Sequence, residues 1–342
     1  MRTAGRISAA IEVLSDVEGR RRPVADALKD WGLSHRFAGS GDRAAIGNLV
    51  YDALRWRSSS AHRSGTDEPR GVVLATLRFR WGMAVDDLAA LGTEAHGPGA
   101  LSDEERAALS EDRLGSAEPA VRADVPEWVA PDLEENFGEE WVDEAAQLAA
   151  RAPVDLRVNT IKTRRQKAIK ALARHGARET PISPVALRLP ARAGWARSAN
   201  ITREEAFQRG HVEVQDEASQ AAALLVYPRS GEQVLDLCAG AGGKTLALAA
   251  QMENRGQIHA TDADQSQLAP IYERLKRAGV RNVQVHGANE DLAAREGRMD
   301  RVLVDAPCSG SGTWRRRPDT KWRLSQDSVA RLREEQAACL DR

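Results

Sequence analysis

A glycine-rich turn and an acidic residue that follows the next strand are the first groups in this sequence suited to chemistry. The turn covers residues 236–245, between an apolar segment at 233–238 that is typical of a strand and a helical pattern at about 243–252. Open α/β sheets bind nucleotide-like ligands at such a turn, because glycines let the backbone approach closely and a helix N-terminus favours negative charge. A second strand, at 257–261, is followed by Asp262, whose carboxylate can accept hydrogen bonds from ribose hydroxyls.

Three ligand classes compete for this turn. A phosphate-binding loop needs a glycine, four further residues and then Gly-Lys-Ser/Thr; residues 243–245 fit, but Cys238 holds the position of the first glycine. The apolar run that ends at Asp305 would then be the acidic strand of an ATPase. A dinucleotide fingerprint needs a third glycine where this sequence has Thr245. An S-adenosylmethionine site needs the glycine turn for the amino-acid end of the cofactor and an acid such as Asp262 for its ribose, although Asp262 can also act as a helix cap.

Cysteine usage, charge and hydropathy exclude several classes of protein. Cys238, Cys308 and Cys339 are too few and too widely spaced for a disulfide framework, and no CxxC pair suggests a metal. The net charge is -1 and 42% of the residues are hydrophobic, with no apolar run long enough to span a bilayer and no signal-peptide pattern at the start. These features predict a reduced, cytoplasmic protein with a sizeable core, no membrane partner and no metal.

The first 130 residues are predicted to form an all-helical domain that ends in a loop-like linker. Helical periodicity runs through 6–30, 42–57 and 71–91, and glycines and prolines interrupt the segment 92–126 around one short acidic helix at 102–112. The polar faces of these helices carry many arginines, which are either an RNA-binding face or an ordinary solvated surface: Arg20, Arg21, Arg22, Arg43, Arg55, Arg57 and Arg63.

The rest of the sequence predicts two α/β domains, at 131–225 and 226–342. The first has strands at 156–160 and 185–189 around a basic helix at 164–175. In the second, strands at 233–238, 257–261, 282–286 and 301–305 alternate with helices, which predicts a parallel sheet. Residues 325–340 read as a helix and no strand follows 301–305, so this fourth strand is expected to be an exposed apolar edge.

The segment that follows the fourth strand resembles a known family. Asp305-Ala306-Pro307-Cys308 after an apolar strand is similar to the fourth motif of the Sun/RsmB family of RNA cytosine-5 methyltransferases, and residues 315–322 are similar to the basic Pro-Asp-x-Lys-Trp loop of that family. Three further segments resemble its cofactor loop and connecting module: 235–245, 214–219 and 156–160. Residues 1–91 resemble the NusB-like domain that bacterial members carry.

The resemblance implies a fold and a set of site residues. The fold is an all-helical NusB-like domain, a small α/β connector and a class I, Rossmann-like methyltransferase domain that lacks its last strands. Asn289 stands in the region where the family has an acid, and Ala239-Gly240-Ala241 replaces the family's Ala-Ala-Pro. The implied cofactor site for S-adenosylmethionine is Cys238, Ala239, Gly240, Ala241, Gly242, Gly243, Lys244, Asp262, Asn289 and Asp305. The implied RNA contacts are Arg315, Arg316, Arg317, Lys321 and Trp322.

The resemblance also implies the reaction. Methyl transfer from S-adenosylmethionine to C5 of a cytosine in RNA, most simply ribosomal RNA, would use Asp305 beside the base and Cys308 in release of the product. The family's main nucleophile, in a Thr-Cys motif, is expected beyond Arg342, and Cys339 is expected to be a helix residue without a catalytic role. The alternatives are an inactive fragment that binds cofactor and RNA, and the ATPase considered above. The chain is expected to be a monomer.

Overall fold

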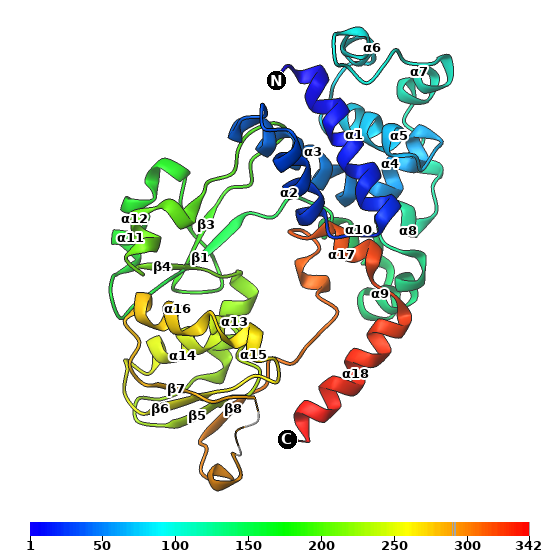
Figure 1. Ribbon diagram of the computed structural model, residues 1–342. Helices are drawn as coiled ribbons and strands as arrows, with labels where there is room; N and C mark the ends of the chain where they lie inside the picture. The colour runs from blue at the N-terminus through cyan, green and yellow to red at the C-terminus, as the bar shows by residue number, and fades with distance from the viewer. Residues whose placement is uncertain (289, 291, 342) are drawn as a thin grey trace. The chain divides into compact units, whose positions relative to one another are not determined.

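The computed structural model describes residues 1–288, 290 and 292–341, and these residues form two compact units (Figure 1). The helical unit consists of Met1–Ala152, Arg192–Ser198 and Ser309–Val329. The α/β unit consists of Pro153–Ala191, Ala199–Cys308 and Ala330–Arg342. None of the described helices is long and apolar enough to cross a membrane. Asn289, one of the predicted cofactor residues, lies outside the described residues.

The helical unit confirms the helices expected from the three periodic segments near the start of the chain. Its core is a cluster of buried aliphatic side chains that includes Ile7, Leu14, Ile46, Leu49 and Leu74. The helices are α1 (Thr3–Arg20), α2 (Val24–Ser34), α3 (Ser40–Arg55), α4 (Arg57–Ser64), α5 (Pro69–Ala75) with a π-helical turn at Thr76–Arg80, α6 (Val85–Thr93), α7 (Asp103–Ser110), α8 (Pro119–Arg122), α9 (Ala130–Phe137), α10 (Trp141–Gln147) and α17 (Pro318–Arg323).

The unit departs from the sequence prediction in two respects. The segment 92–126 is packed rather than a free linker, since Leu109 on α7 is buried in the same core as α1 and α5. The unit also extends past residue 130, because α9 and α10 join it and Trp314 packs in a cluster with Trp141. Of the arginines predicted to lie on polar helix faces, Arg55 and Arg63 are buried.

The first sheet of the α/β unit is antiparallel, with strand order β2-β3-β1-β4. It confirms the two strands and the basic helix predicted for the connector. The strands are β1 (Val154–Val158), β2 (Arg178–Glu179), β3 (Ala186–Leu189) and β4 (Val212–Val214), and the helices of this part are α11 (Arg165–Ala171), α12 (Glu205–Gln208) and α13 (Glu217–Val226). Leu156, Leu172 and Leu187 form the centre of its core.

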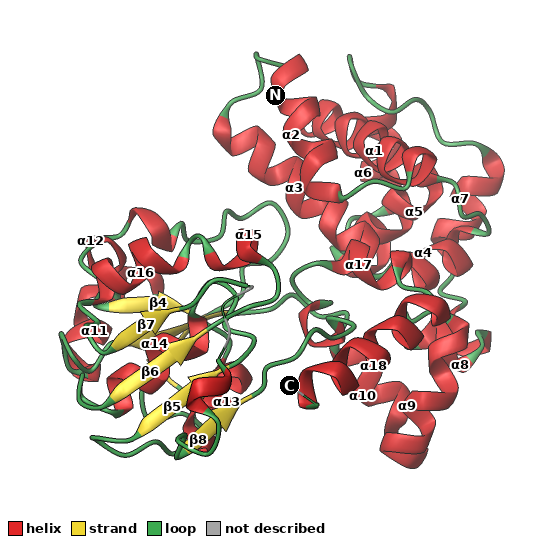
Figure 2. Cartoon of the chain, turned by 60° about the horizontal axis from the view of Figure 1, so that its bottom comes forward, coloured by secondary structure: helices red, strands yellow, loops and turns green. Residues whose placement is uncertain are grey.

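The second sheet is parallel, with strand order β7-β6-β5-β8, as the alternation of strands and helices predicted (Figure 2). Its elements are β5 (Gln233–Asp236), α14 (Gly243–Gln251), β6 (Gln257–Ala260), α15 (Gln265–Leu268), α16 (Ile271–Ala278), β7 (Val283–Val285) and β8 (Arg301–Leu303). Among the described strands β8 pairs only with β5, and Val302 is 52% exposed, so the expected apolar edge is confirmed. The predicted C-terminal helix is α18 (Gln326–Leu340).

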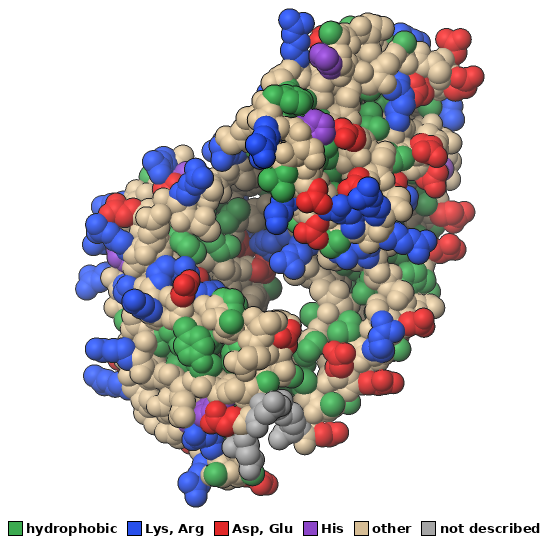
Figure 3. Space-filling view, in the orientation of Figure 1, with side chains coloured by type: hydrophobic (Ala, Val, Ile, Leu, Met, Phe, Trp, Pro, Cys, Tyr) green, Lys and Arg blue, Asp and Glu red, His purple; other side chains and the backbone are tan. Residues whose placement is uncertain are grey.

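Charged side chains are unevenly spread on the surface of the α/β unit. Figure 3 shows lysine and arginine side chains gathered on the side of this unit that carries α11, α12 and α16 (Figure 3).

Candidate functional site

The candidate site lies where the carboxyl ends of three parallel strands meet. Asp236 at the end of β5 is in register with Ala260 of β6 and with Leu303 of β8. Because parallel strands end at the same edge of a sheet, the segments that follow these three residues emerge side by side. This register brings the glycine turn, Asp262 and Asp305 to one edge.

Asp262 braces the glycine turn directly. Its Oδ2 accepts a hydrogen bond from the backbone N–H of Gly240 over 2.8 Å, and its Oδ1 accepts one from the N–H of Asp264 over 2.9 Å. The cap of α15 is Asp264, whose carboxylate accepts the N–H of Ser266 over 2.9 Å. The helix-cap interpretation of Asp262 is therefore wrong, and its carboxylate instead fixes the turn at the end of the neighbouring strand.

Gly242 allows the turn to pass close to α16. Its φ is +80°, in the left-handed region, and a Cβ atom there would lie 2.5 Å from Cγ1 of Ile271. Arg274, one turn further along α16, donates a hydrogen bond to the carbonyl oxygen of Ala241 over 2.7 Å. The turn is thus held from one side by Asp262 and from another by the first half of α16.

Asp236 is a buried carboxyl beneath the turn that the sequence analysis did not assign to the site. Its Oδ2 accepts a hydrogen bond from the hydroxyl of Thr245 over 2.7 Å, whereas its Oδ1 has no partner among the described residues. Burial raises the pKa of Asp236 to about 6, with the hydroxyl of Thr245 opposing the shift and Asp305 adding to it. An acid as the last residue of the strand before a glycine turn was the sequence signal for this position.

A short ion pair joins the helix that follows the turn to the segment that follows β8. Nζ of Lys244, in the first turn of α14, lies 2.6 Å from Oδ2 of Asp305. The side chain of Lys244 is 15% exposed and that of Asp305 is 50% exposed, so the carboxylate remains open to a ligand. Cys308 is exposed three residues further on.

The structure therefore brings together most of the predicted cofactor residues. The turn 238–244, Asp262 and Asp305 meet at one sheet edge, joined by the contacts described above. Cys238 is half-buried, and its Sγ lies 3.8 Å from that of Cys339 on α18. Burial and this contact raise the pKa of the Cys238 thiol well above its usual range. Cys339, expected to be a packed or surface helix residue without a catalytic role, thus lies on α18 against the glycine turn.

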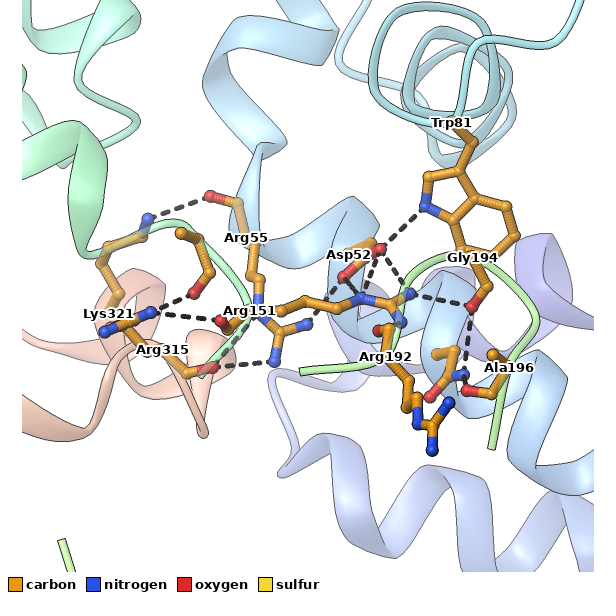
Figure 4. Close-up of polar contacts among 11 residues, drawn as sticks. Asp52, Arg55, Trp81, Arg151, Arg192, Gly194, Ala196, Arg315 and Lys321 are labelled. Atoms are coloured by element: carbon orange, nitrogen blue, oxygen red, sulfur yellow. Dashed lines mark hydrogen bonds and ion pairs between the residues drawn. The ribbon is translucent and has the colours of Figure 1, made fainter. Parts of the chain in front are cut away.

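The predicted RNA-binding loop is largely packed against the helical unit. Lys321 is 1% exposed, and its Nζ donates a hydrogen bond to the carbonyl oxygen of Arg55 over 3.1 Å (Figure 4). Burial lowers the pKa of Lys321 to about 8. Nε1 of Trp322 donates to the carbonyl oxygen of Leu54 over 2.6 Å. The assignment of Lys321 to RNA phosphates is therefore wrong in this structure, because the ammonium group is buried on backbone.

Arginines of the same loop are divided between structural contacts and the surface. The guanidinium of Arg315 donates to the carbonyl oxygens of Ala150 and Arg151, and its own carbonyl accepts two hydrogen bonds from Arg55 (Figure 4). Arg316 is half-buried, whereas Arg317 is exposed. Of these three arginines, Arg317 is the one that the structure leaves exposed.

Comparison with family models identifies two segments. Residues 223–342 match the model described as 16S rRNA methyltransferase RsmB/F, and residues 125–193 match the RsmF/B-like, ferredoxin-like domain. Together these segments cover more than half of the chain. The chain belongs to the RsmB/F methyltransferase family. In this chain, the segment that matches the ferredoxin-like domain contains β1, β2 and β3. The segment that matches the RsmB/F methyltransferase model contains all four strands of the parallel sheet.

Sequence relatives with curated names agree with the RsmB/F assignment. Ribosomal RNA small subunit methyltransferase B of Citrobacter koseri is 33% identical over 220 residues, which cover 63% of this chain and 50% of that protein. The protein of the same name from Klebsiella pneumoniae is 34% identical over 221 residues, covering 63% and 49%. The chain thus spans about half the length of the curated relatives it matches.

Solved structures share the fold. The crystal structure of PH0851 covers 100% of this chain and 82% of its own, with a TM-score of 0.69 and 23% identity. A methyltransferase homolog protein from Pyrococcus horikoshii covers 64% of this chain and 70% of its own, with a TM-score of 0.50 and 28% identity. NSun6 from Pyrococcus horikoshii with SFG covers 63% and 79%, with a TM-score of 0.53 and 20% identity.

Proposed function

We propose that this RsmB/F chain binds S-adenosylmethionine at the edge formed by β5, β6 and β8 and serves methyl transfer to C5 of a cytosine in RNA, with ribosomal RNA as the substrate. The observation that carries the proposal is the Lys244–Asp305 ion pair, which joins the braced glycine turn to the Asp-Ala-Pro-Cys segment. The family's sequence signature and the sheet register both support it.

The residues present fit the cofactor. The turn 238–244 offers backbone N–H groups to a carboxylate at the start of α14, and Asp262 stands at the end of β6, where a carboxylate can accept hydrogen bonds from ribose hydroxyls. Asp262 accepts two backbone N–H groups here, and a carboxylate has further lone pairs for a ribose. When bound, S-adenosylmethionine would supply an electrophilic methyl group on its sulfonium.

The chain's own residues would hold the base and release the product. Addition of the thiolate of the family's Thr-Cys motif to C6 of cytosine makes C5 nucleophilic, and removal of the C5 proton after methylation lets the thiol leave. Asp305, half exposed and held by Lys244, would bind the base near N3 and stabilise charge that develops there. Cys308 would act in release of the methylated product. The target cytosine must be unstacked from its neighbours, because a duplex hides C6.

Calorimetry of S-adenosylmethionine binding tests the cofactor site. Asp262→Ala should weaken binding by roughly 1–3 kcal/mol, the cost of leaving buried polar partners unpaired. Asp264→Ala is a matched control, because it removes a carboxylate two residues away that caps α15 instead of bracing the turn. Equal affinities of wild type and Asp262→Ala would remove this carboxylate from the site.

Transfer of a radiolabelled methyl group to unmodified small-subunit ribosomal RNA tests the reaction. In the presence of the family's Thr-Cys nucleophile, Cys308→Ser is expected to lose activity after the first turnover and to retain the RNA on the protein, because Cys308 would act in release. Cofactor and RNA binding without any transfer would favour the alternative, a binding fragment. Binding of labelled ATP in place of S-adenosylmethionine would overturn the proposal in favour of an ATPase.

A further inference from the structure

A second concave surface of the α/β unit lies outside the methyl-transfer site. It is a pocket of about 860 Å³, lined by Lys162, Gln208, Arg209, His211, Glu273, Lys276 and Arg277. These residues come from the turn after β1, from the end of α12 and the segment that follows it, and from α16. Four of the seven carry a permanent positive charge and one carries a negative charge, so the pocket is basic.

The pocket is built on a buried asparagine. Asn159 is 6% exposed, and its amide donates to the carbonyl oxygens of Gly210 over 2.9 Å and Ala278 over 2.8 Å. Its Oδ1 accepts the N–H of Ile161 over 3.1 Å. This one side chain thus connects the three segments that line the pocket. Asn159 belongs to the 156–160 motif, which contributes no residue to the candidate methyl-transfer site.

Close packing makes this arrangement rigid. Gly210 has a φ of +70°, and a Cβ atom there would lie 2.0 Å from the carbonyl oxygen of Arg277. Nζ of Lys162 donates to the carbonyl oxygens of Arg209 over 3.0 Å and Arg277 over 2.6 Å. The ammonium group of Lys162 is therefore held in place before any ligand arrives, which lowers the entropic cost of binding.

Two of the four cations in the lining have no carboxylate partner among the described residues, whereas Arg277 pairs with the buried Glu213. Within the described part of the chain no carboxylate pairs with Lys162 or Lys276, and both residues are exposed. Arg209 pairs with Glu205 at 2.6 Å, but both side chains are mostly exposed and such a surface pair is weak. Burial and the nearby charges of Lys167, Lys162 and Arg209 lower the pKa of His211.

The pocket is separated from the cofactor turn by the length of one helix. Ile271, the first residue of α16, contacts Gly242 of the turn, and Lys276 and Arg277 near the other end of the helix line the pocket. Eight helical residues span about 12 Å. An RNA strand whose cytosine lies beside Asp305, at the same sheet edge as the turn, therefore has a basic surface about one helix length from that edge.

We propose that the pocket lined by Lys162, Arg209 and Lys276 binds the phosphate backbone of the RNA substrate at a distance from the target base. This inference rests on RNA being the substrate, as proposed above. The lining favours phosphate because ammonium and guanidinium donors face an open surface, and such contacts position a nucleic acid without reading its sequence. The burial of Lys321 supports an RNA contact at this second surface, because the loop at 315–322 exposes fewer cations than its sequence suggests.

Salt-dependent RNA binding by the purified 342-residue chain tests the proposal. Binding of a fluorescein-labelled single-stranded RNA is followed by anisotropy over a series of KCl concentrations. The double variant Arg209→Gln/Lys276→Gln should bind more weakly, and its plot of log affinity against log salt should be shallower by about 1.4, the value for two lost phosphate contacts on a single strand. The matched control, Arg255→Gln/Arg298→Gln, removes two exposed cations of the same unit outside the pocket.

The outcomes separate this proposal from the proposed function. A shallower slope for the pocket variant, with the control like wild type, supports the pocket as an RNA site. If the two variants reduce RNA affinity equally, or if neither reduces it, the pocket is not an RNA site. The proposed function would still stand in that case, provided that the wild-type protein binds RNA and cofactor. Absence of RNA binding by wild type at low salt would overturn both, and calorimetry with S-adenosylmethionine on the same proteins would show whether the cofactor site survives. Thermal melts of all variants check folding.

Discussion

The ammonium group of Lys321 donates a hydrogen bond over 3.1 Å to the backbone carbonyl oxygen of Arg55, although 266 residues separate the two in the chain. Arg55 in turn donates to the carbonyl oxygen of Arg315, and it pairs with the buried Asp52, which also binds Arg151 (Figure 4). Contacts with α3 and with Arg151 thus hold residues 309–329, which directly follow the Asp-Ala-Pro-Cys segment, in the helical unit.

Lys321 gives the stability of the protein a specific pH dependence. Its pKa is about 8 in the fold and 10.5 in the unfolded chain, so between these values the unfolded chain holds a proton that the folded chain lacks. The free energy of unfolding should therefore rise with pH from about 8 to 10. Lys321→Met removes this contribution, and its stability relative to wild type should fall by about 2 kcal/mol over that range.

Urea denaturation at a series of pH values measures this change. Lys29→Met is the matched control, because it removes an exposed lysine of the same unit. Parallel pH profiles for wild type and Lys321→Met would show that the ammonium group is solvated in solution.

Asp236 should reduce stability at neutral pH. Its folded pKa of about 6 exceeds the ordinary 3.8, so the fold retains a proton that the unfolded chain loses, and stability falls as pH rises from about 4 to 6. Asp236→Asn keeps an oxygen that accepts the hydroxyl of Thr245 and should be more stable than wild type at pH 7 by on the order of 1–3 kcal/mol. At pH 4 the two proteins should melt alike. Glu253→Gln, at an exposed position, is the control, and a lower melting temperature of Asp236→Asn at pH 7 would contradict this account.

Cys238 and Cys308 should differ in their rate of alkylation. The thiolate is the reactive form, and the raised pKa of Cys238 keeps that thiol protonated at neutral pH, whereas Cys308 is exposed. Iodoacetamide at pH 7.5 should modify Cys308 at least about tenfold faster than Cys238. Peptide mass spectrometry over a time course measures both rates, with Cys308→Ser to verify the assignment. Equal rates would show that Cys238 is open to solvent and not packed against Cys339.

Two glycines of the cofactor turn provide a matched pair. Gly242→Ala places a methyl group against Ile271 in a left-handed conformation, whereas a Cβ atom at Gly240, also with positive φ, would have no neighbour within 4 Å. Gly240→Ala should cost about 1 kcal/mol from backbone strain alone, and Gly242→Ala should cost a further 1–3 kcal/mol, roughly, from overpacking. Chemical denaturation gives both values, and equal losses would mean that α16 moves freely away from the turn.

The sequence by itself determined the local elements and the family, and it predicted the residues of the candidate site. Apolar periodicity located the helices of the first unit, and the alternation of strands and helices predicted the parallel sheet with its exposed edge at β8. The order strand, glycine turn, helix placed Gly240 and Gly242, since backbone conformation at such a turn depends on the residues themselves. Asp305-Ala306-Pro307-Cys308 identified the family because that order of residues is specific.

Tertiary structure alone decided which charged residues are available for function. The sequence shows Lys321 and Arg315 as members of a basic cluster, but burial depends on what packs over a side chain, and Arg55 comes from the other end of the chain. In the sequence, Asp236 is an ordinary residue at the end of a strand. In the folded protein its carboxyl is buried, and this burial raises its pKa. Likewise, Lys162, Arg209 and Arg277 form one basic pocket only because three separate segments meet at Asn159, and no pattern within any segment predicts that contact.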